Sequence, residues 1–189
     1  MINPQIFVKL LKKRDIAFIS GVPDSLLKSL CACISEEYSD NSHIIATNEG
    51  SAIALGIGYH LGSNKVPMIY MQNSGIGNII NPITSLADKK VYGIPMLLVI
   101  GWRGEILSDG SQLKDEPQHK KQGLITINQL NLLGITCEII DKDTKNLDFL
   151  IDKLLNEAKS KNTPVALVVR KNTFSKYEFS PKIKDNGYL

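Results

Sequence analysis

The sequence has few cysteines, little net charge and no long hydrophobic run, and each absence excludes a class of protein. Its three cysteines, Cys31, Cys33 and Cys137, are odd in number and lack the spacing of a metal site, so we expect buried free thiols. The net charge of +3 comes with lysines scattered along the chain, without the basic run or interleaved aromatics typical of nucleic-acid binding. No apolar run is long enough to span a bilayer, which argues against a membrane protein.

The length and composition indicate one globular domain. A chain of 189 residues holds one domain, or one domain with a tail, and 43% hydrophobic residues is ordinary for a globular protein. The opening Met-Ile-Asn-Pro has no basic segment followed by an apolar stretch, so we expect no secretory signal and a cytoplasmic location.

Apolar runs alternate with helical patterns along the chain, which is typical of parallel α/β proteins. The pattern predicts a three-layer α/β/α fold with a six-stranded, mostly parallel sheet. Residues 97–100 form a nearly continuous apolar run, as expected of a strand covered on both faces. The predicted strands are residues 17–19, 43–46, 66–71, 96–100, 136–140 and 165–169. The predicted helices are residues 4–13, a stretch from about 26, residues 49–61, a helix ending near 87, and residues 126–133 and 147–159.

The end of the chain has a different composition from the rest. From residue 171 it turns polar, with Pro181 and Gly187 and no clear period. We therefore expect a single domain over residues 1–170 and a linker or C-terminal arm over residues 171–189, leading towards something that once followed.

Four strand-to-helix loops carry small and polar residues that would be unusual in purely structural connections. Ligands of an open parallel sheet bind beyond the carboxyl ends of its strands, so these loops are the candidate site. Their glycines match no nucleotide fingerprint, because the third glycine of the Rossmann motif and the P-loop lysine are both missing. The loops are residues 21–25, 48–51, 72–78 and 101–105.

Six segments form a recognisable series along the chain: Gly-Val-Pro-Asp-Ser-Leu-Leu-Lys from Gly21, Asn-Glu-Gly-Ser-Ala from Asn48, Tyr-Met-Gln-Asn-Ser-Gly from Tyr70, Asn-Pro-x-Thr-Ser-Leu-Ala-Asp from Asn81, Ile-Gly-Trp-Arg-Gly-Glu from Ile100 and Lys-Asp-Glu-Pro-Gln-His from Lys114. Together they resemble phosphonopyruvate decarboxylase, closely over residues 21–126 and in general character elsewhere. Sulfopyruvate decarboxylase, a close relative, shares several of them.

The resemblance implies the pyrimidine-binding domain of a thiamine-diphosphate-dependent enzyme. The reaction would convert 3-phosphonopyruvate, a 2-oxo acid, into phosphonoacetaldehyde and CO2, a step of phosphonate biosynthesis. The diphosphate and Mg2+ would sit on a second domain or subunit, in an oligomer that is at least a dimer. Asp109-Gly110-Ser111 lacks the first glycine of the diphosphate and magnesium motif and no asparagine pair follows it, so we expect no metal ligand from this chain.

The resemblance also implies roles for two carboxylates. Glu49 matches the glutamate that hydrogen-bonds the pyrimidine ring nitrogen of the cofactor; the structural alternative is a glutamate favoured by the helix dipole in a first turn. Asp24 lies where related decarboxylases place an acid that handles protons during catalysis. Its alternative role is an N-cap of the following helix, and the two roles can coexist.

The remaining site residues contact the cofactor or the substrate in this interpretation. Asn73, Ser74 and Gly75 lie in a loop where the backbone approaches the flat pyrimidine ring, with a cap-and-turn role as the alternative. Arg103 would hold the phosphonate through paired hydrogen bonds, and Ser25 is a second substrate contact. His119 is a third candidate catalytic residue, with an exposed helix start as its alternative. Residues 106–113 make this loop longer than the family pattern, so the placement of Arg103 relative to His119 is open.

Two other functions fit the same residues. The first is a sulfopyruvate decarboxylase alpha subunit, since that enzyme can consist of two separate chains. The second is a non-catalytic binding module that kept the fold. In either decarboxylase, the chain on its own is only half of an active site.

Overall fold

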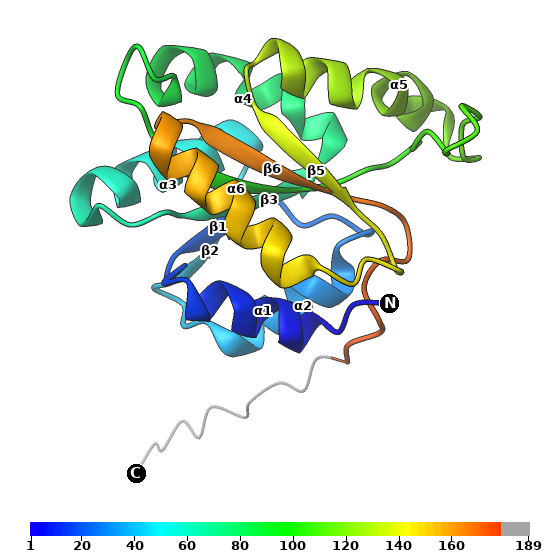
Figure 1. Ribbon diagram of the computed structural model, residues 1–189, viewed down its shortest axis with the longest axis horizontal. Helices are drawn as coiled ribbons and strands as arrows, with labels where there is room; N and C mark the ends of the chain where they lie inside the picture. Colours follow the sequence, from blue (N-terminus) through cyan, green and yellow to red (C-terminus); the bar gives the residue numbers. More distant parts are fainter. Residues whose placement is uncertain (179–189) are drawn as a thin grey trace.

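The computed structural model describes residues 1–178, which form a six-stranded sheet with helices on both faces (Figure 1). The strand order is β2-β1-β3-β4-β6-β5, and every pair is parallel, where the sequence predicted a mostly parallel sheet. The predicted three-layer α/β/α class is confirmed. The strands are β1 (Ile19–Gly21), β2 (His43–Ile45), β3 (Met68–Gln72), β4 (Met96–Gly101), β5 (Thr136–Ile140) and β6 (Pro164–Val169).

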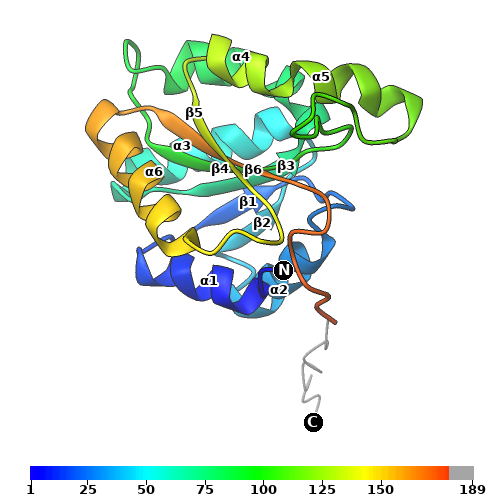
Figure 2. The same cartoon turned by 45° about the vertical axis from the view of Figure 1, so that its right-hand side comes forward.

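The helices divide between the two faces of the sheet. Helices α1 (Pro4–Lys13), α2 (Lys28–Glu37) and α6 (Leu147–Lys161) cover one face, and α3 (Glu49–Ser63), α4 (Ile76–Pro82) and α5 (Pro117–Leu132) cover the other (Figure 2). A short 3-10 turn, η1 (Asn73–Gly75), precedes α4, and a π-helical turn, η2 (Ile83–Ala87), continues it.

The alternation of side chains along the central strands explains the two cores. All six residues of β4 are buried, with Leu97 and Val99 in the core under α1, α2 and α6. Leu98 and Ile100 point to the opposite core under α3, α4 and α5. A continuous apolar run is therefore required here, because both faces of the strand exclude water.

Two predicted boundaries were wrong. Strand β1 lies at Ile19–Gly21 and not at residues 17–19, so the glycine assigned to the loop belongs to the strand. Helix α5 begins at Pro117, nine residues before the predicted start at 126. Its first turns are polar because they are largely exposed, so they carry no hydrophobic period that a sequence reading could detect.

Residues 171–178 pack onto the domain. Ile2 and Phe174 form a parallel bridge, and the Phe174 ring meets Phe7 edge to face at 5.4 Å. The Tyr177 hydroxyl donates to the Glu36 carboxylate on α2. The rest of the predicted arm, residues 179–189, lies outside the described residues, and the division of the chain at residue 170 stays a prediction.

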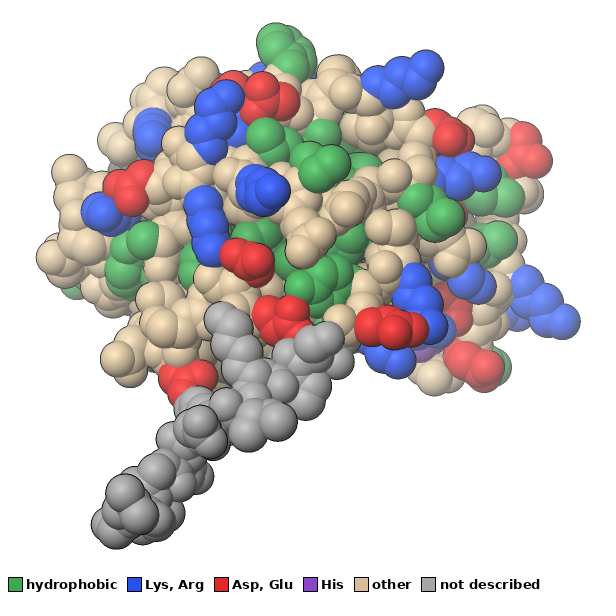
Figure 3. Space-filling model, turned by 90° about the horizontal axis from the view of Figure 1, so that it is seen from below, with side chains coloured by type: hydrophobic (Ala, Val, Ile, Leu, Met, Phe, Trp, Pro, Cys, Tyr) green, Lys and Arg blue, Asp and Glu red, His purple; other side chains and the backbone are tan. Residues whose placement is uncertain are grey.

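The surface shows no dominant charge on the face that Figure 3 presents, where acidic and basic side chains intermingle. Away from the surface, the mostly buried guanidinium of Arg14 binds Asp148 and Asp152 on α6. Among residues 1–178, no helix has both the length and the apolar character needed to cross a membrane.

Candidate active site

The candidate site lies along one edge of the sheet, where the parallel strands end. Since all strands run in the same direction, the loops after β1, β2, β3, β4 and β6 open on this edge. All the site residues that the sequence predicted lie on these loops or at the start of the helices that follow them.

Glu49 is the first residue of α3, and its side chain lies against η1. Asn48 caps the helix by accepting a hydrogen bond from the Ser51 amide at 2.9 Å, which fixes the start of α3. The Asn78 side-chain amide donates to Glu49 Oε2 at 2.7 Å. Glu49 Oε1 has no hydrogen-bond partner within residues 1–178, so one oxygen of a half-buried, oriented carboxylate is left for a ligand.

Gly75 makes this position of the carboxylate possible. A Cβ atom added to Gly75 would lie 2.4 Å from Glu49 Cγ and 2.6 Å from Oε1, far inside van der Waals contact. The Gly75 backbone is α-helical, at φ −70° and ψ −13°, so the glycine is needed for space and not for a left-handed conformation. The close contact at Gly75 is with the Glu49 side chain. The approach of this backbone to a flat ring stays a prediction.

Asp24 is a buried carboxyl without hydrogen-bond partners in the described chain. Its side chain is 6% exposed, and neither oxygen receives a donor with hydrogen-bond geometry. Burial raises the pKa of Asp24, partly offset by the nearby Leu26 amide and by the positive charge of Arg103. A Cβ on Gly101 would lie 2.3 Å from Asp24 Oδ2, so this glycine provides the room for the carboxyl.

The alternative role of Asp24 as a helix cap does not occur. Helix α2 begins only at Lys28, the cap position is Leu27, and no side chain bonds there. A buried carboxyl that neither caps a helix nor accepts a hydrogen bond is costly for the fold. Groups with such perturbed pKa values cluster at sites where proton transfer is needed.

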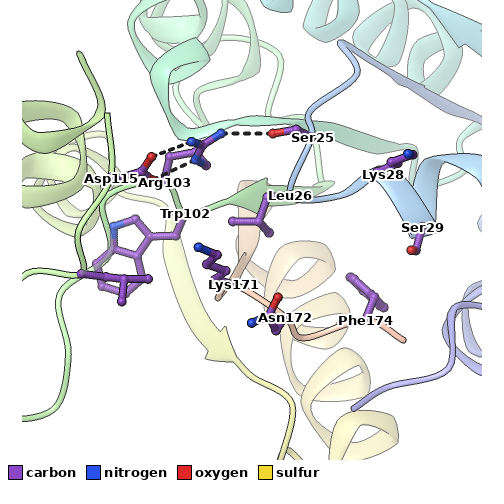
Figure 4. Close-up of a pocket in the computed structure, with 11 residues that line it drawn as sticks. Ser25, Leu26, Lys28, Ser29, Trp102, Arg103, Asp115, Lys171, Asn172 and Phe174 are labelled. Carbon is purple, nitrogen blue, oxygen red and sulfur yellow. Dashed lines mark hydrogen bonds and ion pairs between the residues drawn. The ribbon is translucent and has the colours of Figure 1, made fainter. Parts of the chain in front are cut away.

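Arg103 is held in a forked ion pair with Asp115. Its Nε donates to Asp115 Oδ2 at 2.9 Å and its Nη2 to Oδ1 at 2.5 Å, while Nη1 donates to Ser25 Oγ at 3.1 Å (Figure 4). The Gly104 amide also donates to Asp115, at 2.9 Å. The Arg103 guanidinium holds the pKa of Asp115 well below its usual range. The structure thus brings the Arg103 and Ser25 side chains into contact, and their binding of a substrate stays a prediction.

Asp115 was missed as a site residue, although it lies in the Lys-Asp-Glu-Pro-Gln-His segment. Twelve residues separate it from Arg103 in the sequence, so no local spacing links the two. The only available signal was that one of the recognised segments contains Asp115, an acid with no assigned role, while another contains Arg103, an arginine with no assigned partner.

The Asn73 side chain is bonded within the chain. Its Nδ2 donates to the Arg103 carbonyl and to Thr126 Oγ1, both at 2.9 Å, and its Oδ1 accepts from the Arg103 amide at 3.2 Å. These bonds extend the β3–β4 pairing, which ends at Gln72 and Gly101, by one more step. Asn73 therefore fixes the backbone of Arg103. Its contact with a cofactor stays a prediction, as does that of the exposed Ser74, whose hydroxyl accepts from Gln72 at 2.6 Å.

His119 lies in the first turn of α5, beside the Arg103 loop. Its ring Nδ1 is buried and has no hydrogen-bond partner in the described residues. A Cβ on Gly104, where φ is +62°, would meet the His119 carbonyl at 2.3 Å, so a glycine is required at this contact. The long loop thus returns His119 to the neighbourhood of Arg103, and its catalytic role stays a prediction.

A cavity of about 380 Å³ lies beside these residues. Ser25, Arg103 and Asp115 line it together with Lys28 and Lys171, as Figure 4 shows, whereas Glu49 does not line it. The site therefore has two parts: the Glu49 and Gly75 surface, and a basic cavity at Arg103. Within residues 1–178, no group of three or more His, Cys, Asp or Glu side chains is placed to hold a metal ion.

The fold and these loops define a cofactor-binding domain of the parallel α/β class. The chain belongs to the family of thiamine pyrophosphate enzymes: the family's N-terminal TPP binding domain matches residues 4–130.

Among curated proteins, the chain is similar to two kinds of decarboxylase. It is 43% identical over 96 residues to the sulfopyruvate decarboxylase subunit alpha of Methanocaldococcus jannaschii, covering 51% of this chain and 54% of that protein. It is 37% identical over 134 residues to the phosphonopyruvate decarboxylase of Streptomyces viridochromogenes, covering 70% of this chain and 31% of that protein. The matches thus span about half of one relative and about a third of the other.

Solved structures share the fold. Benzoylformate decarboxylase from Polynucleobacter necessarius has a TM-score of 0.66 at 14% identity, covering 96% of this chain and 33% of that chain. The thiamine diphosphate-dependent 4-hydroxybenzoylformate decarboxylase of Rhodococcus jostii has a TM-score of 0.64 at 14% identity, covering 91% and 31%.

Proposed function

We propose that this chain is the pyrimidine-binding half of a thiamine-diphosphate-dependent decarboxylase that converts 3-phosphonopyruvate into phosphonoacetaldehyde and CO2. The observation that carries the proposal is the Glu49 carboxylate, held by Asn78 against Gly75 with Oε1 unbonded in the described chain. Because the chain belongs to the thiamine pyrophosphate enzymes, the group that this carboxylate would bind is the thiamine cofactor.

The residues at this edge fit a thiamine cofactor. Glu49 presents an oxygen that can share a proton with a weakly basic ring nitrogen, and Gly75 beside it leaves room for the carboxylate. When bound, the cofactor supplies the electron sink for the loss of CO2, which no protein side chain can provide. The part of this chain is to hold the ring and to keep a proton at its nitrogen.

Four further side chains would act on the substrate. Asp24, with its raised pKa, can keep a proton at its carboxyl near neutral pH better than an ordinary aspartate and deliver it to the carbon that loses CO2. Arg103 and Ser25 would hold the remote acid group of the substrate, since they lie together on the cavity. His119 would serve as a second proton-transfer group.

The proposal includes a partner. The diphosphate of the cofactor and its Mg2+ would bind to a second domain or subunit, with the cofactor between the two and the assembly at least a dimer. The sizes of the relatives support this, because the match covers only 31% of the phosphonopyruvate decarboxylase.

Sulfopyruvate is the second candidate substrate. A specific observation favours it: the M. jannaschii relative is a separate alpha subunit, and the match covers 54% of it. The two acids differ in the remote group, a phosphonate or a sulfonate, so a comparison of substrates separates the candidates.

The test is reconstitution. The chain is mixed with the polypeptide that supplies the diphosphate-binding domain, with thiamine diphosphate and Mg2+, and CO2 release from each acid is measured. We expect negligible release by the chain alone and release from 3-phosphonopyruvate by the assembly. Turnover by the isolated chain, or an assembly that releases CO2 from neither acid, would refute the proposal.

A further inference from the structure

We propose that Lys171, with Lys28 at the rim, supplies the net positive charge that binds the remote acid group of the substrate and makes the cavity selective for a dianion. This deepens the proposed function, since it concerns the same site. Lys171 lies outside the six segments that suggest the function, and Lys28 is the last residue of the first of them.

Arg103 alone brings no net charge to the cavity. Asp115 accepts two of its N–H groups, so the pair is neutral overall, and the arginine side chain is only 22% exposed. A guanidinium paired in this way still offers directional donors from its terminal nitrogens. It contributes geometry for an oxyanion, and the attraction for an anion must come from elsewhere.

Lys171 is placed to provide that attraction. It follows β6, and its backbone amide donates to Glu105 Oε2 at 3.1 Å. This hydrogen bond holds the backbone of Lys171 in place. Figure 4 shows its ammonium pointing between Trp102 and Leu26, over the cavity that also holds Arg103.

The charges around Lys171 include Glu105, where the positive charge of Lys171 partly offsets the rise in pKa that burial causes. Glu105, the nearest buried acid, faces Arg170 at 3.7 Å, and Arg170 also stacks over Trp102 at 5.2 Å. No carboxylate in residues 1–178 forms an ion pair with the ammonium of Lys171 or of Lys28. The charge of Lys171 is therefore available to a ligand.

The charges that line the cavity select between the two candidate acids. Three cations, Lys28, Arg103 and Lys171, face one carboxylate, Asp115, for a formal charge of +2. A phosphonate has two acidic protons, so it becomes a dianion in mildly alkaline solution, where the measurements below are made, whereas a sulfonate has one acidic proton and stays a monoanion. Coulomb attraction scales with the charge of the ligand, so the phosphonate gains about twice as much.

The experiment uses the assembled enzyme and four variants: Lys171→Gln, Lys171→Arg, Lys28→Gln and the control Lys176→Gln. Lys176 is on the same segment but outside the cavity, and it pairs with Glu178 on the surface. KM and kcat are measured with 3-phosphonopyruvate and with sulfopyruvate.

We expect Lys171→Gln to raise KM for 3-phosphonopyruvate about tenfold, the loss of one charge-assisted hydrogen bond. The rise for sulfopyruvate should be about threefold, because its charge is half as large. Lys28→Gln should raise the first KM about threefold, Lys171→Arg should restore most of the loss, and kcat should change little. Equal KM values in Lys171→Gln and Lys176→Gln would overturn the inference.

A binding measurement separates this inference from the proposed function. Methylphosphonate and methanesulfonate are titrated into the assembled protein by calorimetry, which needs no turnover. If the assembly decarboxylates neither acid, the proposed function fails; the inference then stands if Lys171→Gln weakens methylphosphonate binding about tenfold. Unchanged methylphosphonate binding in that variant would overturn it in either case.

Discussion

Gly75→Ala should disable the enzyme while leaving its fold intact, because the added methyl group displaces the Glu49 carboxylate. The new Cβ would lie 2.4 Å from Glu49 Cγ, whereas carbon atoms rest about 3.5 to 4.0 Å apart, so the glutamate must move by about 1 Å or more. Gly75 has a helical backbone that alanine adopts freely, so the chain itself is not strained. A misplacement of about 1 Å can cost about a hundredfold in rate.

Gly77→Ala is the matched control, two residues further on. A Cβ there meets nothing within 4 Å, and the residue lies in helix α4, where alanine stabilises by about 0.5 to 1 kcal/mol. We measure kcat/KM of the assembled enzyme and the thermal unfolding of both variants. The Gly75 variant should lose about a hundredfold in kcat/KM with a nearly unchanged melting temperature, and the Gly77 variant should keep its activity.

The pair of variants can also refute the reasoning. If Gly75→Ala and Gly77→Ala differ by less than about twofold in kcat/KM, the carboxylate position does not matter. A further check combines Gly75→Ala with Glu49→Gln: because both changes act through one side chain, the double variant should be no worse than Glu49→Gln alone. Additive losses would place the effect of Gly75 elsewhere.

The remaining predictions concern the three acids of the site. Glu49→Gln should lower kcat of the assembled enzyme by about a hundredfold or more without altering its circular dichroism, and a near-normal rate would remove its assigned role. Asp24→Asn should lower activity yet stabilise the fold by about 1 to 3 kcal/mol at pH 7 in denaturant titrations, since it removes an unpaired buried carboxyl. Because the pKa of Asp24 is raised in the folded state, its destabilising effect grows as pH rises from the ordinary aspartate pKa towards the raised pKa, so the stability gain should shrink in acid; a gain independent of pH would contradict this. Asp115→Asn should release Arg103 and raise KM for either acid about tenfold with a smaller change in kcat, and an unchanged KM would show that the ion pair does not position the arginine.

The fold was predictable because its signal is distributed along the whole chain. Strands β4 and β6 are buried on both faces, so their sequences are continuously apolar. Such runs are typical of parallel strands and could be recognised in the sequence. The start of α5 was missed because its first turns are exposed. Exposed turns need no apolar residues, so the sequence there has no hydrophobic period that would indicate a helix.

The site was predictable only as a set of loops. The sequence identified Glu49, Asp24 and Arg103 by type and motif, but their partners are separated along the chain by up to 78 residues, as for Arg103 and Ser25. Contacts such as Asn73 with the Arg103 backbone, or Gly75 with Glu49, arise from the strand order β1-β3-β4 and from helix packing. Local patterns carry no information about them.

The most direct test of the account follows the proton that Glu49 is proposed to control. In the assembled enzyme, the exchange of the cofactor's C2 proton for deuterium is measured by quenching in acid and recording proton NMR spectra, without substrate. General acid–base assistance predicts that Glu49→Gln slows this exchange about a hundredfold to ten-thousandfold relative to the unmodified chain. An exchange rate that does not change would contradict the central claim, whatever the variant does to turnover.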